Sequence, residues 1–216
     1  MAATMGDVTG MTRRQAEDTS TMPAGLADLV ARAGKTRGTP PVEHWNPPFC
    51  GDIDMRIASD GRWYYMGSPI GREALVRLFA SVLRRDEDGR HYLVTPVERV
   101  GITVEDAPFI AVEMHAQGEG RDRLLTLRTN VGDVVKADAD HPLRFEREVG
   151  TDGLKPYIRV RGGLDALLAR PLLYELAELF EEHNVDGRAM LGVWSGGVFF
   201  PAVAAGEANM ETGGAG

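Results

Sequence analysis

A row of polar side chains on one predicted strand is the pattern in this sequence that comes nearest to a chemical site. Cys50, Asp52, Asp54 and Arg56 alternate with apolar residues, as one face of a β-strand does. Carboxylates beside a guanidinium can hold a metal, bind a polar ligand, or form structural ion pairs that bind nothing. Because no histidine accompanies these carboxylates at ligand spacing, the metal interpretation is the weakest of the three.

Two aromatic residues are predicted to flank this row. Asp60-Gly61 is typical of a two-residue hairpin turn, and the register that follows places Arg56 opposite Tyr65. Trp63 and Tyr65 would then share the face of the polar row and offer a stacking surface to a planar group. The alternative is that both rings pack beneath a neighbouring helix.

Two junctions between a strand and a predicted helix form a second candidate. Residues 67–72 and 161–163 combine glycines with Arg72 and Arg161 near the start of a helix. Free backbone N–H groups and the positive end of a helix dipole attract anions. Neither junction matches a phosphate-binding loop, and ordinary turn chemistry, with Ser68 as a helix cap, is the alternative.

Patterns associated with catalysis are weak. Ser195 lacks the preceding glycine of a nucleophile elbow, and Cys50 has only His44 as a local base. An enzyme using Asp52 or Asp54 as acid or base would need a raised carboxyl pKa within a cleft. The sequence therefore predicts no catalytic residue, no metal ligand and no cofactor.

Composition limits the protein class. The 216 residues, 43% hydrophobic, can bury one core or two small ones. One cysteine suits a reducing compartment, and no apolar run is long enough for a membrane helix, so we expect a cytoplasmic protein without a membrane partner. The net charge of -8 opposes phosphate binding. Nucleic-acid binding therefore ranks behind other functions, unless a local basic stripe exists.

The chain divides into four predicted segments. Residues 1–41 are expected to be largely disordered, with a short helix near 24–33. Residues 42–117 would form a first α+β subdomain and residues 118–205 a second. Residues 206–216 are expected to be a flexible tail.

Hydrophobic periodicity predicts the main elements. Helices are expected at residues 71–85 and 164–182, with Pro171 bending or dividing the second. Similar short stretches at 63–66 and 157–161, each leading through glycine to a helix, hint at an internal duplication. Strands are expected at 50–57, 63–66, 91–95, 100–104, 109–115, 124–129 and 156–161, with weaker candidates at 131–136 and 143–148 and a hairpin within 191–201.

Six motifs identify a family resemblance. They are WNPPFCGDIDMRI, DGRWYYMGSPIGREALVRLFASVL, YLVTPVE, VEDAPFIAVE, TNVGD and PYIRVRGGLDALLARPLLYELAE. In this order they resemble DUF1285, a bacterial family of unknown function, from about residue 25 to residue 201. The resemblance implies an α+β fold of two related β-rich subdomains, each with a packed helix, the second superficially like a pleckstrin-homology domain. It also implies a ligand site near their interface and a role in signalling, but no residue roles.

The leading hypothesis is a non-enzymatic protein that binds a small anionic or nucleotide-like ligand between its two halves, with arginines pairing the anion. The alternative is a regulatory protein–protein module whose helix near 24–33 is released to a partner. The predicted ligand-binding residues are Asp52, Asp54, Arg56, Trp63, Tyr65, Arg72 and Arg161.

Overall fold

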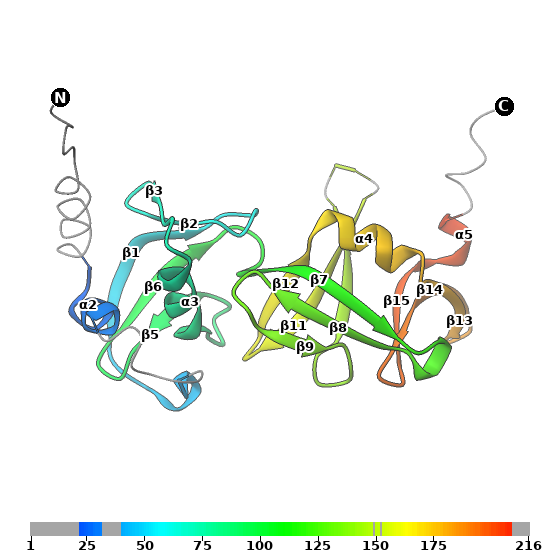
Figure 1. The fold of residues 1–216 in the computed structure, drawn as a ribbon, viewed down its shortest axis with the longest axis horizontal. Coiled ribbons are helices and arrows are strands. Elements are labelled where there is room, and N and C mark those ends of the chain that lie inside the picture. Colours follow the sequence, from blue (N-terminus) through cyan, green and yellow to red (C-terminus); the bar gives the residue numbers. More distant parts are fainter. Residues whose placement is uncertain (1–21, 32–39, 149, 152, 209–216) are drawn as a thin grey trace, which may run out of the picture.

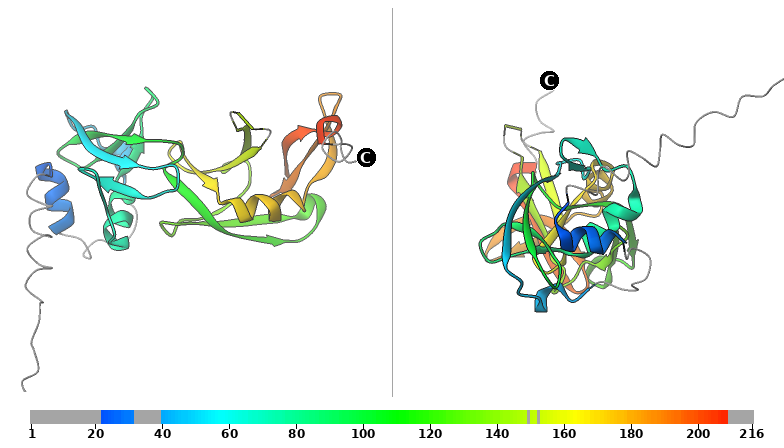
Figure 2. Two further views of the ribbon diagram at one scale, coloured as in Figure 1. Left: turned by 90° about the horizontal axis from the view of Figure 1, so that it is seen from above. Right: turned by 90° about the vertical axis from the view of Figure 1, so that its left-hand side faces the viewer.

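Two β-rich domains lie side by side along the long axis of the molecule, and a small third sheet extends the second domain (Figures 1 and 2). The structure is a computed structural model that describes residues 22–31, 40–148, 150–151 and 153–208. The predicted disordered segment and tail fall mostly outside these ranges. None of the helices in the described ranges has the length and hydropathy needed to cross a bilayer.

The first domain is built on a six-stranded sheet with the order β3-β2-β1-β6-β5-β4. β1 and β6 are parallel at its centre, and the other neighbouring strands are antiparallel. Its elements are α2 (Ala24–Ala31), the 3-10 helix η1 (Val42–His44), β1 (Phe49–Ile57), β2 (Trp63–Tyr65), β3 (Ser68–Pro69), α3 (Glu73–Ser81), β4 (Leu83–Arg85), β5 (His91–Val94) and β6 (Arg99–Val104).

The second domain is built on a sheet with the order β10-β11-β12-β7-β8-β9, in which β12 and β7 are the parallel pair. A three-stranded sheet, β13-β14-β15, packs at its far end, where β15 lies against β10. The elements are β7 (Phe109–Gln117), η2 (Gly120–Asp122), β8 (Leu124–Thr129), β9 (Val134–Lys136), β10 (Leu143–Arg147), β11 (Leu154–Arg161), β12 (Leu164–Leu168), α4 (Arg170–Ala177), β13 (Glu181–Val185), β14 (Arg188–Ser195), β15 (Val198–Ala204) and α5 (Ala205–Ala208).

The two six-stranded sheets have the same topology. Starting from one edge strand, the order is β3-β2-β1-β6-β5-β4 in the first domain and β9-β8-β7-β12-β11-β10 in the second. The predicted α+β class, with two β-rich halves that each carry a helix, is confirmed at this level. The likeness to a pleckstrin-homology domain stays a prediction. β7 belongs to the second sheet, whereas the predicted boundary between residues 117 and 118 would place it in the first.

The first predicted helix is shorter than expected. α3 ends at Ser81, and Leu83–Arg85 forms β4, which pairs with β5. The helical periodicity of residues 71–85 continues past Ser81 into β4, which is an edge strand of the sheet. Arg84 is therefore buried in β4 rather than at a helix C-terminus.

The helix predicted over residues 164–182 is confirmed only in its middle, at residues 170–177, and is wrong at both ends. Leu164–Leu168 is a strand beside β7, α4 covers only Arg170–Ala177, and β13 begins at Glu181. Four of the five β12 residues are buried, as in a central strand. The leucine-rich sequence around them, interrupted by Asp165, fits a helix and a strand alike. Pro171 lies in the first turn of α4, where its missing N–H costs nothing.

The register of the first hairpin differs by one residue from the predicted one. Arg56 lies opposite Tyr64, and Ile57 lies opposite Trp63. The Ala58 N–H donates to the Arg62 carbonyl, so the loop is longer than a two-residue turn. A shift of one residue moves every side chain of a strand to the other face. Trp63 and Tyr65 consequently lie in the core, at 1% and 5% exposure.

The domains meet closely at the tip of this hairpin. A Cβ atom on Gly61 would lie 2.6 Å from the Ile110 side chain and 3.0 Å from the Asn130 amide nitrogen, and its φ is +80°. Asn130 is itself fixed, because its backbone N–H donates to the Ile110 carbonyl and its side-chain oxygen accepts the Ile110 N–H. The buried apolar residues of both domains join in one contiguous cluster.

The predicted N-terminal helix is present as α2 and docks on the first domain. Leu26 is fully buried, and its backbone N–H donates to the carboxylate of Glu98 at 2.8 Å. Gly25 allows this contact, because a Cβ there would lie 2.7 Å from both Glu98 and Thr95. α2 is thus part of the core of the described structure, and residues 32–33 of the predicted helix lie outside the described ranges.

We expect Gly61→Ala to destabilise the protein through both backbone strain and steric overlap. Gly67→Ala is a matched control, since Gly67 also has a positive φ, +75°, but open space at its Cβ position. The control should lose about 1–2 kcal/mol from strain, and Gly61→Ala roughly 1–3 kcal/mol more from overlap. Urea unfolding of both variants measures the difference, and equal losses would contradict the close domain contact.

Replacing Leu26 by alanine should cost about 2–5 kcal/mol of unfolding free energy, because a fully buried leucine leaves a cavity. Leu29→Ala, at a half-buried position of the same helix, should cost less. Chemical denaturation compares the two variants with the wild type. A loss below about 1 kcal/mol for Leu26→Ala would instead fit a helix that detaches easily and is available to a partner.

Candidate functional site

A cavity of about 530 Å³ lies between the two domains, and we call it the interdomain groove. The first domain contributes the hairpin tip, the segment before α3 and the start of α3, while the second contributes β7, β8 and the turn after β8. The volume suits a small organic ligand. Its lining residues are Gly61, Arg62, Trp63, Pro69, Ile70, Gly71, Glu73, Val76, Arg77, Val112, Arg128 and Asn130.

Three guanidinium groups line this groove. Arg62 follows the hairpin tip, Arg77 lies on α3, and Arg128 lies on β8 of the second domain. Each has an acidic neighbour: Arg62 is 3.5 Å from Asp60 and Arg77 is 3.2 Å from Glu73, and Arg128 pairs with Glu113. All six side chains are at least 43% exposed. The exposed pairs of Arg62 and Arg77 are of the kind that contributes little stability, whereas Arg128 holds Glu113 through two hydrogen bonds, from Nε and from an Nη atom.

The start of α3 opens into the same groove. Gly71 and Glu73 line it, and the carbonyl of Arg72 accepts the N–H groups of Leu75 and Val76. The preceding N–H groups of a helix have no intrahelical acceptor and carry the positive end of its dipole. The predicted anion-attracting junction before this helix therefore borders the groove, but the Arg72 side chain does not line it.

Trp63 forms an inner wall of the groove. Its ring stacks on Phe79 at 6.3 Å between centroids, and the side chain is almost fully buried. The indole N–H finds no acceptor among the described residues. A buried donor without a partner costs free energy.

The polar row of β1 lies on another surface. Asp52 pairs with Arg90 at 2.6 Å, Arg56 pairs with Glu105, and both pairs are exposed. The Arg56 guanidinium covers the ring of Tyr64, 4.4 Å from its centroid. Tyr64 therefore takes the position beside Arg56 that was predicted for Tyr65. The predicted face of carboxylates and open aromatic rings does not form, because the hairpin register turns Trp63 and Tyr65 inward.

The remaining predicted residues are also separate from that row. Asp54 is exposed on β1, and its carbonyl accepts the Met66 N–H. Arg161, half-buried, joins the two domains: one Nη atom donates to the Ala80 carbonyl at the end of α3, 2.8 Å away, and the other pairs with Asp133. The guanidinium of Arg161 is occupied by protein partners, which gives it a structural role at the interface.

The comparisons with known proteins cover both domains. A family model described as a domain of unknown function, DUF1285, N-terminal domain, matches residues 40–107. A second, described as a protein of unknown function, DUF1285, C-terminal domain, matches residues 108–202. The chain belongs to the DUF1285 family. The two family models meet between residues 107 and 108, in the linker between β6 and β7.

Two solved DUF1285 structures are similar to this chain. A DUF1285 family protein from Silicibacter pomeroyi DSS-3 is 48% identical, with a TM-score of 0.79, covering 88% of this chain and 100% of that one. Another, from Shewanella baltica OS155, is 26% identical, with a TM-score of 0.45, covering 57% of this chain and 90% of that one. No curated protein matches the sequence. The family assignment is therefore firm, and the function must be argued from the site.

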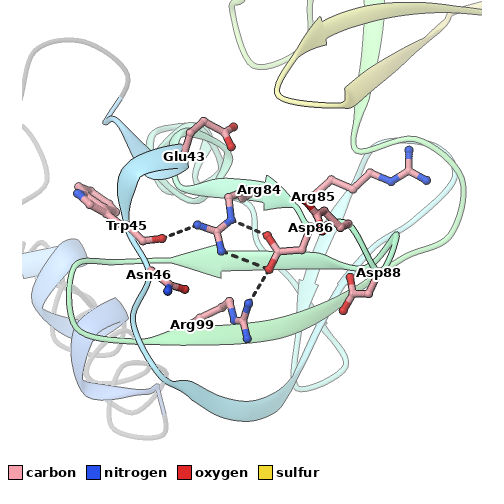
Figure 3. Close-up of a pocket in the computed structure, with 9 residues that line it drawn as sticks. Glu43, Trp45, Asn46, Arg84, Arg85, Asp86, Asp88 and Arg99 are labelled. Atoms are coloured by element: carbon pink, nitrogen blue, oxygen red, sulfur yellow. Dashed lines mark hydrogen bonds and ion pairs between the residues drawn. The ribbon is translucent and has the colours of Figure 1, made fainter.

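A second cavity of this DUF1285 protein, of about 550 Å³, lies beside η1 and β4 (Figure 3). Its centre is a network in which Asp86 accepts hydrogen bonds from Arg84 and Arg99. Arg84 also donates to the carbonyls of Val42 and Trp45. The network holds the chain before β1 against β4. Its lining carries three arginines and four carboxylates, so this cavity is the weaker candidate for binding an anion.

His91 on β5 is a titratable group near the domain interface. Its pKa is lowered to about 4, chiefly by partial burial and also by the positive charge of Arg85, while Asp165 of the second domain acts in the opposite direction. Its unfolded pKa is near 6.5. Since the unfolded chain binds the proton more tightly, this group's contribution to stability is complete above about pH 6.5 and is lost as the pH falls towards 4.

We expect His91→Gln to reduce the acid sensitivity of folding. Between about pH 7 and pH 5, the wild type should lose about 1 kcal/mol more unfolding free energy than the variant, allowing for the partial exposure of the ring. Arg85→Gln should also reduce the loss, because removing the cation raises the pKa of His91. Urea unfolding at the two pH values measures this, and identical losses in all three proteins would contradict it.

Proposed function

We propose that this DUF1285 protein binds a small anion in the interdomain groove. The observation that carries the proposal is the convergence of Arg62, Arg77 and Arg128 on one cavity from three separate elements and from both domains. Guanidinium groups form strong charge-assisted hydrogen bonds with carboxylates and phosphates. The Asn130 amide adds a donor, because its oxygen is already used by Ile110.

Local charge supports the same ligand class. The whole chain carries a net charge of -8, whereas the residues that line the groove include three arginines and one carboxylate, Glu73. This local excess of positive charge attracts anions. The present neighbours of these cations are exposed carboxylates, with Glu73 itself at the groove wall. A ligand anion can replace Asp60 and Glu73 at little cost in stability, and it competes with Glu113 for Arg128.

The proposal revises the recognising groups predicted from the sequence. Arg56 does not line the groove, and Arg161 is engaged by protein partners from both domains. The groove residues above take over the role of pairing the ligand anion. Because both domains line the groove, a bound ligand would stabilise their docking. The family resemblance implies a role in signalling. We propose that this role depends on the coupling between ligand binding and domain docking.

Inorganic pyrophosphate is a suitable first probe, and we expect it to raise the melting temperature of the wild type. Arg77→Gln and Arg128→Gln should each weaken binding about tenfold, since each removes one charge-assisted hydrogen bond. Titration calorimetry measures the affinities, and urea unfolding confirms that both variants fold.

Arg56→Gln is the matched control, because Arg56 is a partly exposed arginine in a comparable ion pair that does not line the groove. It should bind pyrophosphate like the wild type. Equal weakening in all three variants would indicate nonspecific charge attraction and contradict a site in the groove.

A further inference from the structure

The interdomain groove has an aliphatic wall as well as cations. Ile70 and Val76 line it from the first domain, and Val112 lines it from β7 of the second. Val112 lies in β7 of the second sheet and is 39% exposed. Apolar side chains that remain accessible within a cavity favour ligands with an apolar part. The groove thus offers two kinds of contact to one ligand.

The groove offers no open aromatic face. Trp63 is the aromatic residue among its lining groups, and its side chain is 1% exposed and stacked on Phe79. Tyr64, the neighbouring ring, lies under the Arg56 guanidinium. A nucleobase gains much of its binding energy by stacking on an accessible ring. The lining therefore favours an aliphatic group over a base.

From these contacts we infer that the ligand is a compact aliphatic anion, a phosphate or carboxylate carrying a short hydrocarbon group, rather than a nucleotide. This inference rests on the proposed function and defines its ligand class. The anionic head lies among Arg77, Arg128 and the Asn130 amide, and the hydrocarbon lies against Val76 and Val112. Both ends of the ligand touch both domains.

Three probes separate the contributions of the two ends: inorganic phosphate, n-butyl phosphate and adenosine monophosphate. Each buried methylene strengthens binding by about fourfold, so partial burial of the butyl chain should make n-butyl phosphate about tenfold tighter than inorganic phosphate. Adenosine monophosphate should bind no tighter than inorganic phosphate. Titration calorimetry on the full chain gives the three dissociation constants.

Val112→Thr is the decisive variant, because threonine keeps the shape of valine and adds a hydroxyl. It should reduce the ratio between the affinities of n-butyl phosphate and inorganic phosphate. Val134→Thr is the matched control: Val134 is a 62% exposed strand valine that does not line the groove. This control should leave that ratio unchanged.

The outcomes distinguish the ligand class from the site. If inorganic phosphate binds and requires Arg77 and Arg128, but n-butyl phosphate binds no tighter, the ligand class is overturned and the proposed function stands. Tighter binding of adenosine monophosphate than of n-butyl phosphate also overturns it. If the wild type binds none of the three probes, the proposed function and the ligand class both fall.

Discussion

The close approach of the Gly61 backbone to the side chains of Ile110 and Asn130 is the constraint that shapes the interdomain groove. The hairpin tip of the first domain reaches Ile110 and Asn130 of the second at a distance that leaves no room for a Cβ atom. Asn130 is held in turn by two hydrogen bonds with Ile110. The residues on either side of this contact, Trp63 and Arg128 among them, become walls of one cavity.

The sequence predicted much of β1 but not the register of its hairpin. Alternating polar and apolar residues gave the correct strand and the correct exposed face, with Met55 and Ile57 buried. The Asp60-Gly61 pair suggested a two-residue turn, which requires positive φ at both central positions. Among the described residues other than glycine, only Met66 and Asp186 have positive φ. Asp60 is therefore not in that conformation, and the longer loop moves both predicted site aromatics into the core.

Prediction of the site was limited for a different reason. The general location between the halves and the glycine-containing segment before α3 were available from the sequence. Arg62, Arg77 and Arg128 were not, because each reads locally as an ordinary surface residue of a turn, helix or strand, and only the tertiary arrangement brings them together. The error over residues 164–182 has a similar origin, since leucine-rich segments satisfy either period until their neighbours are known.

The parallel strand pairs determine when each sheet can form during synthesis of the chain. In each six-stranded sheet the first strand pairs with the last: β1 with β6 and β7 with β12. Neither sheet can be completed until its final strand has been synthesised, and such non-local pairing is slow to form. Because the closing strand of the first domain ends at Val104, that sheet can be completed while the second domain is still emerging from the ribosome. Domain order along the chain thus becomes an order of assembly, and the Gly61 hairpin tip is in place before Ile110 and Asn130 arrive.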